Sequence, residues 1–347
     1  MNMPSMSIAG RRISQDDPPY IIAELSANHN GKLETALRIV EEAKKAGADA
    51  VKLQTYRPDT ITLDSDSEDF RIHGGLWDGR TLYELYEEAH MPWEWHKPLF
   101  DHARNLGITI FSSPFDTTAV DLLEDLNTPA YKIASFEAVD IPLIEYVAST
   151  GKPMIISTGM ADADEIQEAI SAAKGAGCNE LAVLHCVSGY PAPAADYNLR
   201  TIQDMVDRFQ IVAGLSDHTL GNSTAIASIA MGASIIEKHF TLNKDDIGPD
   251  HAASLEPEEL KNMIGGIRNI QDALGDGEKK PTNIEIQNME AARKSIVTKT
   301  EIKRGDVFSE ENLTTKRPGT GISPMLWDKY IGKKSMKDYK KDTLLKE

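Results

Sequence analysis

The sequence predicts a (β/α)8 barrel followed by a small second domain. Short, apolar, β-branched runs alternate with helical patterns of about 10–15 residues, and eight such repeats suit a closed parallel barrel. The charge balance then changes sign along the chain. Residues 1–289 hold 23 Lys and Arg against 45 Asp and Glu, whereas residues 290–347 hold 14 against 9. A change of this size indicates a separate second domain.

Eight runs have the length and composition of strands. They are residues 20–24, 50–54, 108–112, 130–134, 154–157, 181–186, 211–215 and 234–238. Helical patterns fall at residues 34–46, 95–106, 117–126, 142–149, 163–176, 199–209, 223–231 and 257–274. A doubly wound sheet is the alternative, but the first strand runs into AELSANHNG, which lacks the Gly-x-Gly-x-x-Gly phosphate loop usual there.

The boundary between the two domains is predicted within residues 275–292. The sequence GDGEKKPTN in this stretch has the Gly, Pro and charged residues of a linker. We therefore expect a barrel domain at residues 1–280, and a linker with a small domain at residues 281–347. A basic tail on an acidic enzyme is the alternative. The apolar periodicity and turn signals of the last residues favour a folded module.

The composition argues against several classes of protein. The formal charge of −17 does not suit a general nucleic-acid binder, which needs a basic surface. Cys178 and Cys186 are the only cysteines, so no disulfide framework is expected. The first twenty residues hold no apolar run of signal-peptide length, and residues 222–236 are too short and too rich in Ser and Gly to span a bilayer. A reducing cytoplasm is the expected location.

Polar or ionisable residues stand at the end of nearly every predicted strand. Barrel active sites are built at the C-terminal ends of the strands. A single residue of this kind is usually a helix cap or a solvated charge, but the recurrence over eight strands predicts a site there. The residues are Glu24, Asn28, Lys52, Gln54, Ser112, Ser113, Lys132, Ser135, Ser157, Ser188, Tyr190, Ser216, Asp217, His218, Glu237 and His239.

His218 and His239 are the best candidates for metal ligands. They lie 21 residues apart, at the ends of the seventh and eighth strands, so both can face the same mouth. Neutral imidazole binds divalent transition metals. Glu237 and Asp217 are expected to alternate off the histidine faces, which predicts an open site completed by water and substrate rather than a structural zinc site. Two buried structural histidines explain this pair equally well.

Lys52 and Lys132 each interrupt an apolar run, in DAVKLQ and PAYKIAS. A buried ammonium needs a partner or an anionic ligand. With Ser135, Ser157 and Ser216 nearby, the lysines are expected to clamp a phosphate or a carboxylate. The alternative is a Schiff-base lysine of the class I aldolase type. The histidine pair argues against it, because either device alone can activate a carbonyl.

Motifs along the whole chain resemble those of one family. From about residue 19 to residue 347 the sequence resembles the sialic acid synthases, which are barrels with a C-terminal antifreeze-like (SAF) domain. The barrel motifs are IIAELSANHNG, GADAVKLQT, FSSPFD, PAYKIASFE, GKPMIISTGM, LHCVSGYPAP, GLSDHTLGN, IIEKHFTL and GPDHAASLEP. The motif that resembles the SAF module is IKRGDVFSEENLTTKRPGTGI.

The resemblance implies a reaction and its cofactor. Enzymes of this family condense phosphoenolpyruvate with an open-chain N-acylated amino sugar aldehyde, cleave the C–O bond of phosphoenolpyruvate and release phosphate. They use a divalent metal, Mn²⁺ or Mg²⁺. In this chain His218 and His239 would hold the metal. The phosphate and carboxylate of phosphoenolpyruvate would be held by Lys52, Lys132, Ser135, Ser157 and Ser216.

Further roles are implied by the same motifs. Gln54 would lie near the metal-bound water, and Glu237 would orient the end of the eighth strand. Sugar contacts and proton movements are assigned to Glu24, Tyr190 and Asp250. Other substrate contacts are assigned to Asn28, Ser113 and Phe115. Ser188 departs from the pattern, because relatives often carry Asn at this position of the substrate pocket.

Residues 56–91, after the second strand, form a segment long enough to act as a lid over the site. The sequence GGLWDGRTLYELYEEAHMPWEWHKPLF, which begins within it, resembles the branch of the family that makes pseudaminic acid. The implied acceptor is 2,4-diacetamido-2,4,6-trideoxy-L-altrose, with N-acetylneuraminate and legionaminic acid synthases as alternatives. Packing on the barrel also explains the aromatic cluster of Trp77, Tyr83, Tyr86, Trp93 and Trp95.

The basic second domain predicts attraction to the acidic barrel of a partner chain. Arg317 lies in TKRPGTG, a turn that suits an exposed tip. The resemblance implies a domain-swapped homodimer in which Arg317 reaches over the sugar in the partner's barrel. A solvated arginine is the alternative. For the whole chain the alternatives are a catalytically silent barrel that binds sugar acids, or an ice-binding-like adaptor acting through its tail.

Overall fold

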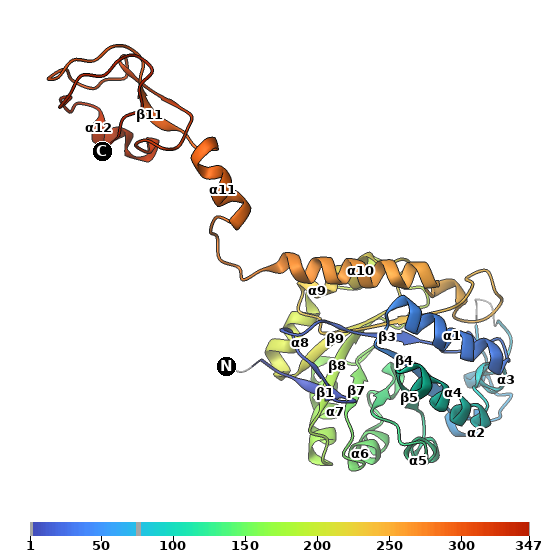
Figure 1. Cartoon of the computed structure of the whole chain (residues 1–347). Helices are drawn as coiled ribbons and strands as arrows, with labels where there is room; N and C mark the ends of the chain where they lie inside the picture. Colours follow the sequence, from blue (N-terminus) through green and yellow to red (C-terminus); the bar gives the residue numbers. More distant parts are fainter. Residues whose placement is uncertain (1–2, 74–77, 347) are drawn as a thin grey trace. The chain divides into compact units, whose positions relative to one another are not determined.

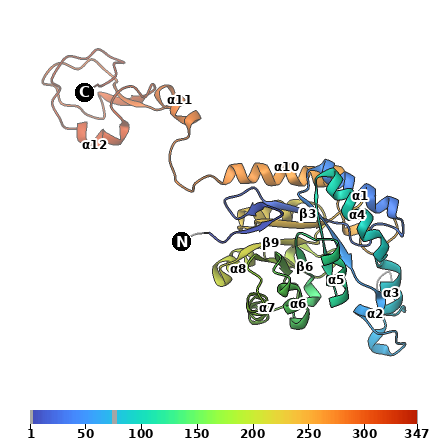
Figure 2. The same ribbon diagram turned by 60° about the horizontal axis from the view of Figure 1, so that its bottom comes forward.

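A computed structural model of the chain describes residues 3–73 and 78–346. Trp77 of the predicted aromatic cluster lies outside these residues. The chain divides into two compact units, Met1–Gly275 and Asp276–Glu347. The division lies at the start of the predicted linker. Figures 1 and 2 show the elements of both units.

The first unit is a closed barrel of eight parallel strands in the order β10-β3-β4-β5-β6-β7-β8-β9. The strands are β3 (Tyr20–Glu24), β4 (Ala50–Thr55), β5 (Thr109–Pro114), β6 (Tyr131–Ile133), β7 (Met154–Ser157), β8 (Leu181–Cys186), β9 (Val212–Asp217) and β10 (Ile235–His239). Every predicted run is a strand. The doubly wound alternative is excluded, because the closed barrel has no unpaired edge.

Helices follow the strands and cover the outside of the barrel. They are α1 (Leu33–Ala46), α4 (Trp93–Leu106), α5 (Thr117–Asp125), α6 (Ile141–Ser149), α7 (Ala163–Gly175), α8 (Thr201–Phe209), α9 (Ser223–Ala230) and α10 (Pro257–Leu274). Their apolar faces repeat at helical spacing and are buried on the strands, as in α8 with Ile202, Met205 and Phe209. Helices α5 to α8 lie next to one another along one side of the barrel (Figure 2).

A short hairpin closes the N-terminal end of the barrel. It consists of β1 (Met6–Ile8) and β2 (Arg11–Ile13), which pair antiparallel. Met6, Ile8 and Ile13 are buried in one cluster with Tyr20 and other side chains from inside the barrel. This packing leaves the opposite, C-terminal end of the strands as the place for a site.

The predicted lid segment is mostly ordered structure. It contains α2 (Pro58–Ile61), a 3₁₀ turn (Glu68–Phe70) and α3 (Leu82–Ala89). Packing accounts for two residues of the predicted aromatic cluster that lie in α4, just after this segment. Trp93 lies under the Arg57 guanidinium, 4.6 Å from ring centroid to Cζ, and Trp95 meets His29 edge to face at 5.4 Å.

The second unit has its own small core. It contains α11 (Asn283–Ala292), β11 (Ser295–Thr298), β12 (Leu313–Lys316) and α12 (Trp327–Tyr330), and the two strands pair antiparallel. The buried core consists of Ile296, Ile302, Phe308, Leu313, Ile322 and Leu345. Among the helices described in either unit, none is long and apolar enough to cross a membrane.

Gly214 tests the tight packing of the barrel wall. A Cβ atom at this position of β9 would press on the carbonyl oxygen of Ile235 and lie 2.7 Å from the Leu184 side chain. We expect Gly214→Ala to lower the free energy of unfolding by about 1–3 kcal/mol through overpacking. Urea denaturation measures the change.

The matched control for this substitution is Gly265→Ala. Gly265 lies in α10, and its Cβ would meet no heavy atom within 4 Å. Alanine there should raise the free energy of unfolding by roughly 0.5–1 kcal/mol, because it favours the helix. Equal unfolding midpoints for the two variants would contradict this account of the wall.

Candidate active site

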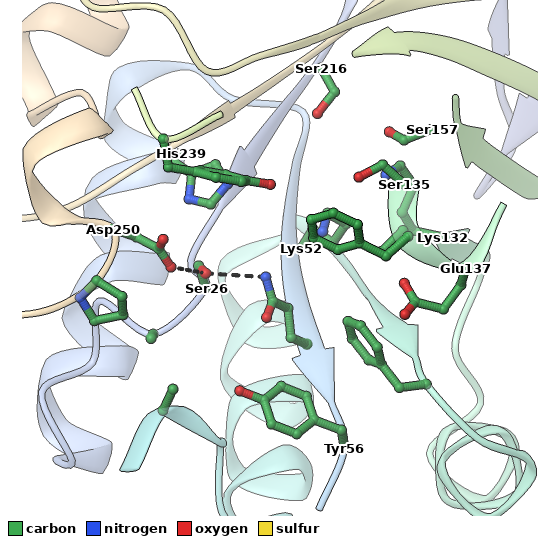
Figure 3. Close-up of a pocket in the computed structure, with 18 of the residues that line it drawn as sticks. Ser26, Lys52, Tyr56, Lys132, Ser135, Glu137, Ser157, Ser216, His239 and Asp250 are labelled. Carbon is green, nitrogen blue, oxygen red and sulfur yellow. Dashed lines mark hydrogen bonds between the residues drawn. The ribbon is translucent and has the colours of Figure 1, made fainter. Parts of the chain in front are cut away.

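A cavity of about 320 Å³ opens at the C-terminal end of the barrel strands. All eight barrel strands, or the loops that directly follow them, contribute residues to its lining. Figure 3 shows their polar side chains converging from different elements. The predicted site residues that line the cavity are Lys52, Gln54, Phe115, Lys132, Ser135, Ser157, Tyr190, Ser216, His218, Glu237, His239 and Asp250.

Two lysines and two glutamates form a buried charge cluster at the base of the cavity. Lys52 Nζ lies 2.5 Å from Glu24 Oε2 and 3.8 Å from Glu237 Oε1. Lys132 Nζ lies 3.6 Å from the same Glu237 oxygen. None of the four side chains is more than 4% exposed. Buried charges are found in folded proteins when they are paired with opposite charges, because burying an isolated ion costs several kcal/mol.

The four groups do not share their charge evenly. Burial lowers the pKa of Lys132, and Glu237 only partly offsets this effect. Burial acts on Lys52 too, but Glu237 and Glu24 together hold its pKa above the usual value. Burial raises the pKa of Glu24, against the opposing effect of Lys52. Lys132 is therefore the cation with the weaker pairing, and an anion bound beside it would supply the missing charge.

Three serine hydroxyls surround the lysine end of the cavity (Figure 3). Ser216 Oγ donates to Glu237 Oε1 at 3.2 Å, and Ser135 Oγ lies 3.0 Å from Ser188 Oγ. The buried Ser157 hydroxyl has no hydrogen-bond partner among the residues that the structure describes. A buried hydroxyl without a partner is rare, so this group is free to bind a ligand oxygen.

The two histidines meet at the cavity wall, with ring centroids 5.3 Å apart. Burial lowers the pKa of His218 to about 4, and burial lowers that of His239 as well, so both rings are neutral at pH 7. His218 Nδ1 lies 2.8 Å from the Val187 carbonyl oxygen. A carbonyl can only accept, so Nδ1 carries the proton and Nε2 keeps its lone pair. Neutral rings with free lone pairs suit a metal ion.

The ligand set for such a metal is small. His239 Nδ1 is buried, and no group in the described part of the chain bonds to it. Within residues 3–73 and 78–346, no group of three or more His, Cys, Asp or Glu side chains is arranged to hold a metal ion. A metal bound by the His218 and His239 pair would therefore take its other ligands from water and substrate.

The expectation that Glu237 points away from the histidines is wrong. Glu237 precedes His239 by two residues on β10, so both side chains lie on the same face of the strand, and both line the cavity. Asp217 does point away. Its carboxylate binds Lys238 Nζ at 2.9 Å, with both side chains completely buried. This second ion pair ties the end of β9 to the end of β10, where the histidines stand.

Four predicted residues lie near the cavity but do not line it. The Asn28 amide donates to the Phe240 carbonyl and to Ser254 Oγ, so it holds the loop after β10. Glu24 and Ser113 lie behind Lys52, whose Nζ is 3.3 Å from Ser113 Oγ. Ser188 lies beside the site and bonds to Ser135, which lines it.

Arg317 lies in the second unit. Its Nε donates to the Ala292 carbonyl oxygen at 2.7 Å, at the end of α11. The sequence interpretation of an arginine on an exposed turn agrees with this position, since the residue is exposed.

Glu137 is a cavity residue that the sequence interpretation missed. It ends the 3₁₀ turn Ser135–Glu137 after β6, and its buried Oε2 has no partner within the described residues. Burial raises its pKa to about 7. Glu137 belongs to the motif PAYKIASFE, but in the sequence alone it does not differ from a solvated carboxylate in a turn. A carboxyl group with a pKa near neutrality can give or take a proton.

A polar band crosses the middle of the cavity. Ser26 Oγ donates to Asp250 Oδ2, and Gln54 Nε2 donates to Ser26 Oγ at 3.1 Å, as Figure 3 shows. Gln54 Nε2 also lies 3.1 Å from Glu24 Oε1, which links this band to the buried charges. The band offers hydroxyl-binding groups between the histidine side and the opposite wall.

Comparison with known proteins agrees with the geometry of the site. A pseudaminic acid synthase of Campylobacter jejuni is 45% identical over 332 residues, which are 96% of each chain. An N,N'-diacetyllegionaminic acid synthase of C. jejuni is 42% identical and covers 94% of this chain and 98% of its own. The crystal structure of an N-acetylneuraminic acid synthetase from Leptospira borgpetersenii superposes with a TM-score of 0.74 at 31% identity, over 83% of this chain and 96% of that one.

Two family descriptions match separate parts of the chain. Residues 39–279 match the NeuB family, and residues 293–347 match the SAF domain. The first match covers most of the barrel unit, including both lysines and both histidines of the cavity. The chain therefore belongs to the NeuB family and ends in a SAF domain.

Proposed function

We propose that this protein condenses phosphoenolpyruvate with 2,4-diacetamido-2,4,6-trideoxy-L-altrose to give pseudaminic acid and phosphate. The main support for this reaction is that one cavity contains both a lysine–serine group able to bind an anion and a pair of neutral histidines. The C. jejuni relative named pseudaminic acid synthase supports the choice of acceptor. Legionaminic acid and N-acetylneuraminate synthesis are the alternatives. The intact cluster of ionisable groups argues against a silent sugar-binding barrel. We also propose that the protein is located in the cytoplasm.

Phosphoenolpyruvate would bind at the lysine end of the cavity. Its phosphate and carboxylate would pair with Lys52 and Lys132 and accept hydrogen bonds from Ser135, Ser157 and Ser216. The free Ser157 hydroxyl and the weak pairing of Lys132 support this placement. Both lysines lie within 4 Å of a glutamate, which favours ammonium groups that bind charge over an imine-forming lysine.

His218 and His239 would hold a divalent metal, for which Mn²⁺ and Mg²⁺ are the proposed candidates. The two neutral rings and the unpartnered His239 nitrogen support this assignment. When bound, the metal supplies Lewis-acid polarisation of the acceptor carbonyl. Tyr190, whose ring centroid lies 4.2 Å from that of His218, would cover this side of the cavity and limit access of bulk water.

The reaction forms one carbon–carbon bond and breaks one carbon–oxygen bond. C3 of the enol attacks the acceptor aldehyde carbon, and the aldehyde oxygen takes up a proton to become a hydroxyl. Water then adds to C2 and loses a proton. The C2–O bond to phosphate breaks, its electron pair leaves with the phosphate, and the C2 hydroxyl loses its proton to become the ketone of the product. Lys52 and Lys132 stabilise the phosphoryl oxygens during this step. Glu137, beside Lys132 in Figure 3, would donate a proton to the departing oxygen.

The second unit of a partner chain would complete the site in a domain-swapped homodimer. Large apolar side chains stand exposed on the loops that follow β6, β7, β8, β9 and β10: Phe136, Met160, Tyr190, Leu220 and Ile247. An apolar ring around a cavity mouth marks an interaction site. The partner's residues 290–347 carry 14 basic against 9 acidic residues, which complements the acidic barrel. Arg317 of that unit would contact the sugar.

Phosphate release tests the reaction and its acceptor together. With phosphoenolpyruvate and Mn²⁺, we expect release only when an acceptor is added, and faster with the diacetamido trideoxy sugar than with N-acetylmannosamine. Chelation should abolish release because two histidines alone cannot polarise the carbonyl, and Mn²⁺ should restore it. A coupled phosphate assay measures the rates. Equal rates with both sugars would remove the pseudaminic assignment, and full activity after chelation would remove the metal.

Glu137→Gln tests the proposed proton donor. We expect kcat to fall about 10²–10⁴-fold, because the amide cannot give up a proton at neutral pH. The raised pKa means that Glu137 is protonated below a pH of about 7, so the rate of the unaltered enzyme should fall as pH rises through that value. The variant should lose this step in its pH–rate profile. Glu145→Gln, on the exposed side of α6, is the matched control and should change neither quantity.

Mixed dimers test the swapped arrangement. Arg317→Ala chains and Lys52→Ala chains should each be nearly inactive as pure dimers. After subunit exchange, a mixed dimer contains one site with both residues intact, so activity should recover toward half of the unaltered value in that species. Phosphate release before and after exchange measures it. If exchanged dimers show only the activity of their parents, Arg317 does not act across the dimer.

A further inference from the structure

The cavity has an apolar end that the reaction described above does not use. Besides Tyr56, five of its lining side chains come from the lid segment and the neighbouring end of β5: Ile61, Leu85, Tyr86, Ala89 and Phe115. Four of them carry no hydrogen-bonding group in the side chain, and only Tyr86 has a hydroxyl. We call this set the apolar wall. It contrasts with the lysines, histidines and carboxylates on the rest of the cavity surface.

We propose that the apolar wall selects the acceptor sugar by binding the methyl-bearing end farthest from its aldehyde. The preferred acceptor then carries a methyl group at C6, as in a 6-deoxy hexose, where an ordinary hexose carries a hydroxymethyl group. This inference rests on the proposed condensation and assigns its specificity to named residues. The wall residues would bury the methyl group of the preferred sugar. The hydroxyl of a hydroxymethyl group in the same place would find no hydrogen-bond partner among the aliphatic side chains of the wall.

Helix α3 presents its apolar face to the cavity instead of to a core. Leu85 and Ala89 lie four residues apart and therefore on one face of the helix. All eight residues of α3 are described, and none of them is buried, although the helix is amphipathic. The start of the helix is held by a capping box, in which Thr81 Oγ1 accepts from the Glu84 N–H and the Glu84 carboxylate accepts from the Thr81 N–H. A capped helix whose half-buried apolar face lines a cavity is suited to an apolar ligand.

Tyr56 lines the cavity beside the apolar wall and packs against two of its rings. It is only 4% exposed, and its ring packs edge to face on Tyr86 at 5.6 Å and on Phe115 at 5.2 Å between centroids. The three rings join the lid segment to the ends of β4 and β5. The wall is thus supported by the barrel, which a specificity surface requires.

The order of groups along the cavity points the acceptor toward this wall. Figure 3 shows Tyr56 on the opposite side of the cavity from Ser216 and Ser157. Phosphoenolpyruvate occupies the serine side in the proposed reaction, and the histidines mark the reacting carbonyl. The band of Ser26, Gln54 and Asp250 lies in between and can bind hydroxyl or amide groups. The acceptor atoms beyond that band are therefore the ones that reach the wall.

The test compares two acceptors that differ only at C6. The first is the 2,4-diacetamido-2,4,6-trideoxy sugar, and the second is its analogue with a hydroxymethyl group. For the unaltered enzyme we expect a kcat/KM ratio of roughly tenfold or more in favour of the methyl sugar. Leu85→Asn should reduce this ratio several-fold, mainly through a higher KM for the methyl sugar. Leu85→Met should keep the ratio, and the KM for phosphoenolpyruvate should not change in either variant.

Two further variants keep the test independent of folding. Leu63→Asn is the matched control: Leu63 belongs to the same segment, is 67% exposed and does not line the cavity, so the ratio should stay unchanged. Ile61 lies in α2, on another helix of the wall. Ile61→Thr should therefore lower the kcat/KM ratio of the two sugars even if Leu85→Asn fails to fold.

Three results would overturn the inference. In the first, the unaltered enzyme shows no preference for the methyl sugar. In the second, the wall variants lower kcat/KM equally for both sugars. In the third, Leu63→Asn shifts the ratio as much as Leu85→Asn does. Absence of turnover by the unaltered enzyme with either sugar would instead overturn the proposed function itself, and this inference with it.

Discussion

Four buried charges at the base of the cavity constrain everything around them. Lys52, Lys132, Glu24 and Glu237 come from four different strands, and each is compensated only while the barrel stays closed and in register. Removing one partner would leave an unpaired buried charge, at a cost of about 3–5 kcal/mol. The pairing is incomplete at Lys132, where burial still lowers the pKa. A bound anion would compensate the charge of Lys132. The cluster that is costly to bury is therefore also suited to binding an anionic substrate.

The histidine pair depends on a second buried ion pair behind it. Lys238 and Asp217 alternate with His239 and His218 along β10 and β9, so they point out of the cavity when the histidines point in. Their contact, and the bonds from the Thr219 N–H and hydroxyl to Asp217, hold the strand end and the following turn. The imidazoles themselves stay neutral because burial lowers the pKa of both.

The cavity therefore has three regions with different chemistry. Charged and hydroxyl groups occupy one side, the histidines and the Ser26–Asp250 band occupy the middle, and apolar side chains of α2 and α3 occupy the far side. In the proposed reaction, phosphoenolpyruvate and the amino sugar would use these three environments in that order. The first two regions come from the barrel strands. The third comes mainly from the lid segment, which contributes no residue to the charge cluster.

The sequence by itself determined the barrel, the end at which the site lies, and most of the polar residues in it. This was possible because apolar runs and helical patterns depend on local spacing, and because strand ends in a barrel meet at one mouth. It did not determine which side chains face the cavity or how burial changes their pKa values. Glu237 faces the cavity beside His239, Asn28 is occupied by the loop after β10, and Glu137 gains a pKa of about 7 from its surroundings. Only the tertiary structure decided these points, because facing and desolvation depend on neighbours that lie far away in the chain.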